Sequence, residues 1–253
     1  MKPNRLYILT GASRGLGAAM AEQLLAPDTV LLTLSRHPDA TLLARAQGAG
    51  ATVEQWSIDL GHDIGAAARL ETWLHQRAAA GFTSAALINN AGLLGRVGPI
   101  SHSDSEELAA VLRVGLEAPL LLAAAFLRAT RDWAIDKRVL SISSGAAKRP
   151  IAGWAAYCAA KAGLDHVSRV TALDEARLPN PARIVSLAPG VIDTDMQGEL
   201  RAADASGFPE QSHFVELKSS GQLPTPQAAA ARVLAYLHRD DFGRDPVADV
   251  RQA

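Results

Sequence analysis

The chain has 253 residues, enough for one large α/β domain that buries about three-quarters of the surface exposed by its unfolded chain. Its 25 Lys and Arg nearly balance 26 Asp and Glu. This balance excludes the basic surface of a nucleic-acid-binding domain and the charge runs of a membrane-surface segment. Cys158 is the only cysteine, so no intramolecular disulfide can form and a reducing compartment is expected.

The start of the chain carries no targeting pattern. Residues 1–5 lead directly into a short apolar stretch, without the longer apolar run and small-residue cleavage site of a secretory signal. No uninterrupted apolar run approaches the roughly 20 residues that span a bilayer. We therefore expect a cytoplasmic protein that does not bind a membrane.

Short apolar runs alternate with longer stretches of helical composition. The expected strands are residues 6–9, 30–34, 52–58, 85–88, 138–142 and 183–187. The expected helices are residues 16–25, 40–47, 64–80, 105–131 and 155–176. Continuous apolar strands separated by helices predict a parallel sheet with helices on both faces. The expected fold class is α/β: one doubly wound domain over residues 1–253, which binds ligands beyond the carboxyl ends of its strands.

A glycine-rich turn joins the first expected strand to the first expected helix. Gly11 permits a tight turn, Gly15 lets the backbone approach a pyrophosphate, and Gly17 lets helix and strand pack closely. The free N–H groups at the start of the helix favour phosphate. The turn therefore predicts a dinucleotide site with contacts from Gly11, Ser13, Arg14, Gly15, Leu16 and Gly17.

The end of the second expected strand indicates which dinucleotide binds. An NAD site usually carries Asp or Glu there, which bonds the ribose 2′-hydroxyl. Residues 34–37 read Leu-Ser-Arg-His and contain no acid. Arg36, together with Arg14 in the turn, could pair with a 2′-phosphate, although either could be an ordinary surface charge. The missing carboxylate favours NADP(H) as the cofactor.

Tyr157 and Lys161 lie four residues apart in the fifth expected helix, which places both side chains on one face. A neighbouring ammonium favours the phenolate and would lower the pKa of the tyrosine from about 10, so that it exchanges a proton near neutral pH. Ser144, at the end of the fifth expected strand, could hold a carbonyl oxygen beside the phenol. Polar clusters follow the fourth and sixth strands at the same sheet edge: Asn89, Asn90, Ala91 and Gly92, then Pro189, Gly190 and Thr194.

Together these motifs resemble those of the short-chain dehydrogenase/reductase family, over essentially the whole chain. The resemblance implies a single Rossmann-like domain and hydride transfer between a nicotinamide and a carbonyl or alcohol. It implies that Tyr157 is the acid and base, that Lys161 binds the nicotinamide ribose and tunes the tyrosine, and that Ser144 orients the substrate. By the same resemblance, the other residues that bind the cofactor are Asp59 near the adenine, Thr194 near the nicotinamide carboxamide, and Asn90, Ala91, Gly92, Pro189 and Gly190.

One residue departs from the family pattern. The family has an Asn in the long helix before the fifth strand, where it helps to hold a water molecule in the proton relay. Gly115 stands at that position here. Either a second water fills the gap, or the relay follows another route. We expect an additional ordered water near Gly115, at a modest entropic cost, and an active enzyme.

Several stretches resemble more narrowly the sepiapterin reductases and the benzil-type ketone reductases: residues 153–158, 193–197, 214–223 and 240–242. The leading interpretation is an NADPH-dependent reductase of a small ketone or vicinal diketone. The alternative enzyme is a sepiapterin (pterin side-chain) reductase. The alternative of another class is an NADP(H)-binding regulatory protein without significant turnover, which Gly115 favours and which Ser144, Tyr157 and Lys161 oppose.

Three residues are candidates for substrate contact. By resemblance to sepiapterin reductase, Asp249 would anchor the amino-pyrimidine edge of a pterin through two parallel hydrogen bonds, or it could cap a terminal strand. Trp154 and Met196 could form apolar walls for a flat substrate or belong to the core. Residues 198–226, polar and interrupted by Gly and Pro, are expected to form a helical lid over the cleft or a plain surface insertion.

The sequence shows no motif for binding a metal or a nucleic acid. The seven His residues lack metal-ligand spacing, and the four Trp residues form no stacking platform for nucleic acid. We therefore expect a small-molecule carbonyl substrate and no metal, nucleic acid or membrane. The family and the long apolar helices at 105–131 and 155–176 suggest a homodimer or homotetramer.

Overall fold

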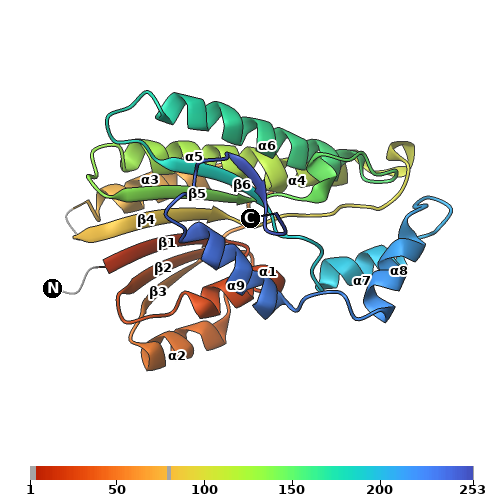
Figure 1. Ribbon diagram of the computed structural model, residues 1–253, viewed down its shortest axis with the longest axis horizontal. Helices are drawn as coiled ribbons and strands as arrows, with labels where there is room; N and C mark the ends of the chain where they lie inside the picture. Colours follow the sequence, from red (N-terminus) through yellow and green to blue (C-terminus); the bar gives the residue numbers. More distant parts are fainter. Residues whose placement is uncertain (1–3, 79–80, 253) are drawn as a thin grey trace.

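The computed structural model describes residues 4–78 and 81–252. They form a seven-stranded sheet in the order β3-β2-β1-β4-β5-β6-β7, with all neighbouring strands parallel (Figure 1). The order reverses between β1 and β4, which opens a crevice beyond the carboxyl ends of these strands. The strands are β1 (Asn4–Thr10), β2 (Thr29–Ser35), β3 (Thr52–Ser57), β4 (Phe82–Asn89), β5 (Asp136–Ile142), β6 (Arg183–Ala188) and β7 (Val247–Asp249).

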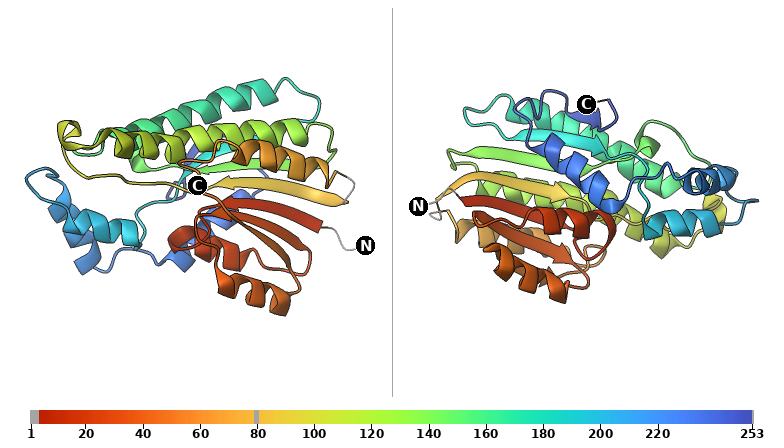
Figure 2. Two further views of the ribbon diagram at one scale, coloured as in Figure 1. Left: turned by 180° about the vertical axis from the view of Figure 1, so that it is seen from behind. Right: turned by 60° about the horizontal axis from the view of Figure 1, so that its bottom comes forward.

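Helices cover both faces of the sheet. One layer contains α1, α2 and α9, and the other contains α3, α4, α5 and α6, while α7 and α8 project beyond the carboxyl edge (Figures 1 and 2). Their bounds are α1 (Gly15–Gln23), α2 (Ala40–Ala49), α3 (Ala66–His75), α4 (Ser105–Leu112), α5 (Ala118–Ala129), α6 (Ala155–Glu175), α7 (Asp195–Ala202), α8 (Gln211–Ser219) and α9 (Pro226–Leu237).

The alternation of side chains along β1 divides the core between the two faces. Tyr7 and Leu9 pack toward α1 and α9, whereas Leu6 and Ile8 pack toward α3 and α5. Because successive side chains of a strand point to opposite faces, a strand that is apolar throughout must be covered on both sides. The expected α/β fold class, a single doubly wound, Rossmann-like parallel sheet, is confirmed.

The structure differs from the expected elements at four places. The stretch 105–131 is not one α-helix, because a π-helical turn at Arg113–Glu117 separates α4 from α5. The short edge strand β7 and the helix α9 were not among the expected elements. The third expected helix ends at His75 rather than at residue 80, and residues 79–80 lie outside the described residues.

Within the described residues, Ser105–Ala129 is long and apolar enough, by length and composition alone, to cross a membrane. Arg113 and Glu117 interrupt its apolar run. In the fold, its α5 half buries Leu122 and Phe126 against the sheet and packs along α3. The core therefore accounts for part of this apolar character, whereas Leu120 and Leu121 of α5 are exposed.

Candidate active site

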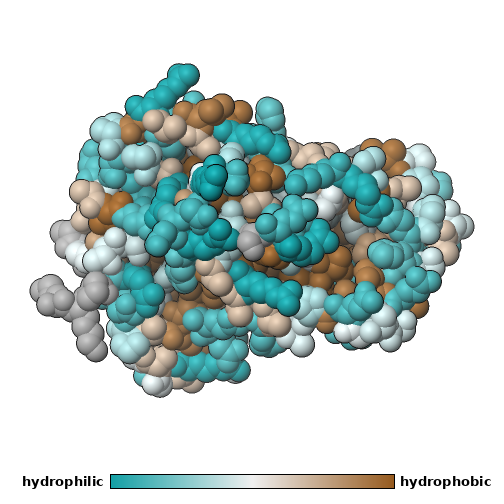
Figure 3. Space-filling view, in the orientation of Figure 1, coloured by the Kyte–Doolittle hydropathy of each residue, from teal (hydrophilic) through white to brown (hydrophobic). Residues whose placement is uncertain are grey.

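A cavity of about 490 Å³ lies at the carboxyl edge of the sheet, between the main body and α7–α8. In Figure 3, hydrophobic side chains line the hollow between these two parts. The cavity brings together nearly all the residues expected at the site: Gly11, Ser13, Arg14, Gly15, Leu16, Gly17, Arg36, Asp59, Asn90, Ala91, Gly92, Ser144, Trp154, Tyr157, Lys161, Pro189, Gly190, Thr194 and Met196. Their individual roles remain predictions.

The glycine-rich turn is tied closely to the end of β4. The Thr10 hydroxyl accepts hydrogen bonds from the backbone N–H groups of Asn90 and Ala91, at 2.9 and 3.0 Å. The Asn90 amide donates back to the carbonyls of Thr10 and Gly11, at 3.0 and 3.1 Å. Gly11 has φ +70°, a conformation that side-chain-bearing residues rarely adopt. The turn is therefore held rigid from behind, with its open side toward the cavity.

The start of α1 is a suitable place for an anion. Its N-cap residue is Arg14, and no side chain caps the first turn. The first N–H groups of a helix lack partners within the helix and carry the positive end of its dipole. Because this end of α1 lines the cavity, it can bind the pyrophosphate of a dinucleotide.

Two arginines, Arg14 and Arg36, line the cavity near the glycine-rich turn and the end of β2. Arg36 follows β2, and its carbonyl accepts a hydrogen bond from the Ser57 hydroxyl at 3.0 Å, which fixes the backbone there. The guanidinium of Arg14 lies 3.5 Å from the Asp195 carboxylate, and both side chains are mostly exposed. An exposed ion pair of this length contributes little, so Arg14 can turn toward a bound phosphate.

Tyr157 stands in the middle of the cavity wall. It belongs to α6, is only 9% exposed, and packs edge-on against Trp154 with ring centroids 5.5 Å apart. Burial raises the pKa of the Tyr157 phenol, and the Ser144 hydroxyl opposes this effect. A tyrosine whose pKa is raised is fully protonated at neutral pH and can act as a proton donor.

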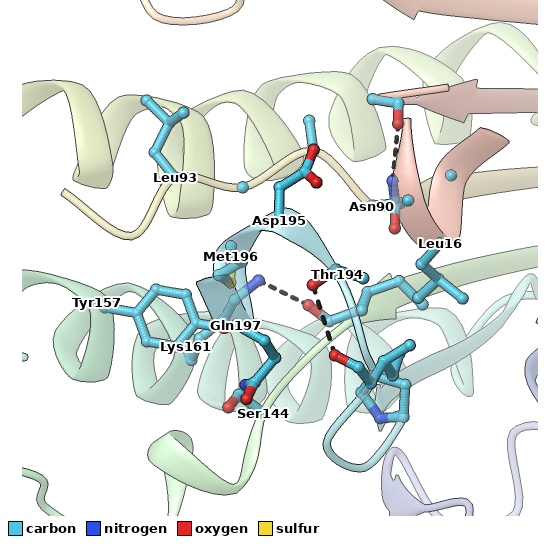
Figure 4. A pocket seen from close by; sticks show the side chains of 18 of the residues that line it. Leu16, Asn90, Leu93, Ser144, Tyr157, Lys161, Thr194, Asp195, Met196 and Gln197 are labelled. Carbon is cyan, nitrogen blue, oxygen red and sulfur yellow. Dashed lines mark hydrogen bonds between the residues drawn. The ribbon is translucent and has the colours of Figure 1, made fainter. Parts of the chain in front are cut away.

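Lys161 lies one helical turn further along α6 (Figure 4). Its ammonium donates a hydrogen bond to the Ile142 carbonyl at 2.7 Å and lies 5.7 Å from the centre of the Tyr157 ring. Burial lowers the pKa of Lys161 to about 8, and the Asp165 carboxylate opposes this effect. The expectation of a lowered pKa for Tyr157 is wrong in this structure, because burial is the largest influence on the phenol and raises its pKa.

A buried carboxylate behind Lys161 was not expected from the sequence. Asp165 accepts hydrogen bonds from the hydroxyls of Ser143 and Ser186, at 2.6 and 2.7 Å. These bonds join α6 to the ends of β5 and β6 and so fix the helix that carries the tyrosine and lysine. The spacing of four residues from Lys161 to Asp165 was the available signal, since it repeats the spacing from Tyr157 to Lys161.

The wall opposite the glycine-rich turn is apolar and aromatic. Trp154 stacks on Phe208 with ring centroids 5.4 Å apart, and Phe214 of α8 lies 5.7 Å from Trp154. Arg149 and Glu210 form two hydrogen bonds, at 2.6 and 2.7 Å, that link the segment after β5 to the start of α8. Cavity-lining residues that were not expected include Leu93, Ala146, Ile151, Val191, Gln197, Leu200, His213 and Phe214.

Asp249 does not line the cavity, in contrast to the other candidate substrate residues. Both of its carboxylate oxygens are bound by the Arg251 guanidinium, at 2.9 and 2.5 Å. This ion pair lowers the pKa of Asp249. The expected contact between Asp249 and a substrate is therefore not supported, because the carboxylate is already occupied, whereas Arg251 itself lines the cavity.

Gly115 lies in the π-helical turn, where the chain passes close to α6. A Cβ atom added at Gly115 would lie 3.0 Å from the Cβ of Ala160, the residue beside Lys161. Such a distance is shorter than an ordinary van der Waals contact, so a side chain here would press on α6. The structure thus provides a packing reason for the glycine that is independent of catalysis.

We expect Gly115→Asn to lower the melting temperature, because overpacking costs about 1–3 kcal/mol. The same substitution in an Ala160→Gly background should cost less, since the opposing Cβ is gone, and a double-mutant cycle of melting temperatures measures this coupling. Additive effects would contradict the crowding argument.

We expect kcat of the Gly115→Asn variant to change only modestly. A hundredfold rise would show that the natural relay is impaired and would favour a regulatory protein.

Comparisons with known proteins agree with this geometry. Residues 5–205 match the family model described as short chain dehydrogenase. The benzil reductase ((S)-benzoin forming) of Bacillus cereus is 34% identical over 243 residues, which cover 96% of this chain and 98% of that protein. The sepiapterin reductase of Meriones unguiculatus is 36% identical over 246 residues, which cover 93% of this chain and 92% of that protein.

A solved structure supports the same conclusion. A short-chain dehydrogenase/reductase from Burkholderia vietnamiensis superposes with a TM-score of 0.67 and 36% identity, covering 99% of both chains. The chain therefore belongs to the short-chain dehydrogenase/reductase family, whose members are oxidoreductases that bind nicotinamide cofactors. The family expected from the sequence is confirmed.

Proposed function

We propose that the protein is an NADPH-dependent reductase that transfers a hydride to a carbonyl of a small ketone or vicinal diketone. The observation that carries this proposal is geometric: the buried phenol of Tyr157 lines one cavity with Ser144, Lys161 and the glycine-rich turn. The similarity to a benzil reductase over nearly the whole chain supports the substrate class.

The residues fit a dinucleotide. The close approach of Gly17 to the turn leaves no room for a side chain, and the first N–H groups of α1 face the cavity. When bound, NADPH supplies the hydride. The turn and the start of α1 would hold the pyrophosphate, Thr194 and Lys161 would hold the nicotinamide end, and Asp59 would contribute to the adenine end.

The chain's own residues then carry out the proton chemistry. Ser144 donates a hydrogen bond to the substrate carbonyl and orients it beside Tyr157. The Tyr157 phenol donates its proton to the carbonyl oxygen as the carbon is reduced. Lys161, with a pKa of about 8, is mostly protonated at pH 7 and stabilises the resulting phenolate. Trp154 and Phe214 exclude water from the reacting carbon.

Arg36 sets the cofactor preference in this proposal. We expect NADPH to bind at least tenfold more tightly than NADH, about 1.4 kcal/mol or more, because a guanidinium pairs with the 2′-phosphate. Arg36→Asp should reverse this order, since a carboxylate repels the phosphate and accepts a hydrogen bond from a 2′-hydroxyl. Titrations of both cofactors into both proteins measure the change. Equal dissociation constants in the natural protein would contradict the assignment.

Sepiapterin reduction is the second candidate function, favoured by the similarity to sepiapterin reductases. The position of Asp249 disfavours sepiapterin reduction, because its carboxylate is paired with Arg251 and does not line the cavity. The third candidate is an NADP(H)-binding regulator. NADPH consumption measured against benzil, other diketones, simple ketones and sepiapterin distinguishes the three candidate functions. Turnover of diketones supports the proposed ketone reductase, and a preference for sepiapterin supports a sepiapterin reductase. No turnover of any of them supports the regulator.

The proposal includes a lid, an assembly and a location. Residues 198–226 cover the substrate end of the cavity as a lid, supported by Leu200 and Phe214 in its lining. A homodimer or homotetramer forms through α5 and α6, supported by the exposed Leu120 and Leu173 on these helices. The protein acts in the cytoplasm.

A further inference from the structure

Gln197 is a buried polar side chain in the cavity wall that the proposed mechanism does not use. It lies in the first turn of α7, is 7% exposed, and lines the cavity together with Ser144 and Tyr157. Its carboxamide oxygen is buried without a hydrogen-bond partner. Figure 4 shows Gln197 beside Ser144 and Tyr157, on the far side of the cavity from Asn90.

A helix-capping role does not account for this side chain. Thr194 and Gln197 have the spacing of a capping box, in which the hydroxyl bonds the backbone of the third residue and the carboxamide bonds back to the N-cap. In α7 the Thr194 side chain makes no cap hydrogen bond. The Thr194 carbonyl instead accepts the Gln197 backbone N–H at 2.9 Å. The carboxamide is therefore left free at the cavity wall.

An unpaired buried amide points to a polar partner in the ligand. A buried donor or acceptor without a partner loses its hydration and gains nothing in return. A carboxamide carries a donor end and an acceptor end. Because the buried end of Gln197 is its oxygen, a ligand in the cavity can reach only the NH₂ group, which donates to a carbonyl oxygen of the substrate.

We propose that Gln197 is a specificity-determining residue that binds the second oxygen of a vicinal dicarbonyl while Tyr157 and Ser144 bind the carbonyl being reduced. This inference rests on the proposed function and names its substrate class. A diketone offers one acceptor to the Gln197 NH₂ group and one to the hydroxyls of Tyr157 and Ser144, and reduction of one carbonyl leaves the second carbonyl in place. A ketone with a single oxygen leaves the Gln197 NH₂ group without an acceptor.

The test compares benzil with 1,2-diphenylethanone, in which a CH₂ group replaces one carbonyl. Benzil is intrinsically more electrophilic, so the informative quantity is the change in the ratio of their kcat/KM values on mutation. We expect Gln197→Met to lower the benzil-to-monoketone ratio at least tenfold, because a site that bonds a substrate oxygen discriminates strongly against its absence. The value for the monoketone should stay within about twofold.

Two further proteins serve as controls. Gln211→Met makes the same change on α8, at a glutamine that bonds the Arg201 carbonyl and does not line the cavity, and should leave the ratio unchanged. Gln197→Leu replaces Gln197→Met if the latter does not fold. Neither Gln197 variant should melt below the natural protein, since each removes an unpaired buried polar group.

An equal loss for both ketones, or an unchanged ratio, would overturn the inference, because Gln197 would then serve packing or the lid. Failure of the proposed function has a different signature, namely no turnover of either ketone by the natural protein. In that case, calorimetric titration of benzil in the presence of NADP⁺ still tests Gln197. At least tenfold weaker binding by Gln197→Met supports the inference, and equal binding contradicts it.

Discussion

Replacing Tyr157 with Phe is expected to lower kcat for ketone reduction by about a hundredfold to ten-thousandfold, the usual contribution of a positioned general acid. The phenol is the proton donor of the proposed mechanism, and a phenol is protonated at neutral pH. Phenylalanine keeps the ring and its edge-on contact with Trp154, 5.5 Å between centroids. NADPH binding should therefore survive, which separates loss of chemistry from loss of structure.

The matched control is Tyr236→Phe. Tyr236 lies on α9, away from the cavity, so its loss of a hydroxyl should leave kcat unchanged. Steady-state rates on a diketone and a titration with NADPH measure both variants. If Tyr157→Phe retains most of its kcat on every substrate, the mechanism assigned to this cavity is wrong.

Replacing Gly17 with Ala is expected to damage both stability and cofactor binding. The added Cβ would lie 2.0 Å from the Gly11 carbonyl oxygen and 2.6 Å from the Asn90 amide nitrogen. The nearest of these atoms is backbone, so α1 must move away from the turn. We expect a loss of about 3 kcal/mol, at the upper end of the usual cost of overpacking. We also expect NADPH to bind at least a hundredfold more weakly, because the phosphate-binding N–H groups move with the helix.

Gly48→Ala is the matched control for this prediction. Gly48 lies in α2, and a Cβ there would meet nothing within 4 Å. Alanine is favoured over glycine in a helix by about 1 kcal/mol, so this variant should melt at the same temperature as the natural protein or slightly higher. A Gly17→Ala protein with unchanged melting temperature and NADPH affinity would contradict the packing described for the turn.

Local pattern was sufficient to predict most of the fold. Apolar runs such as 30–34 are buried on both faces of a parallel sheet, and the strands therefore stand out from the polar loops around them. The edge strand β7 could not be found in this way, because three residues form it only by pairing with β6. Helix α9 had a signal that was overlooked: Thr225 caps it by accepting the Ala228 N–H at 3.2 Å, and Pro226 occupies its first turn.

The candidate site was predictable where spacing determines geometry. Tyr157 and Lys161 share a helix face, and the polar clusters share an edge of the sheet, so both groups were found from the sequence. The direction of the pKa shift of Tyr157 could not be predicted from the sequence, because it depends on how deeply Trp154 and the residues around it bury the phenol. The missing hydrogen-bond partner of the Gln197 carboxamide could not be predicted from the sequence either, because its spacing from Thr194 is typical of a helix capping box.

The central claim, direct hydride transfer to a carbonyl in this cavity, is tested most directly with deuterium-labelled cofactor. The natural protein is incubated with benzil and NADPH that carries deuterium at the transferable position, and the product is analysed by mass spectrometry and NMR. We expect one hydroxy ketone per NADPH oxidised, with deuterium on the carbinol carbon and a hydroxyl proton from solvent. Bound NADPH that is not oxidised, or a product without deuterium on that carbon, would contradict the account.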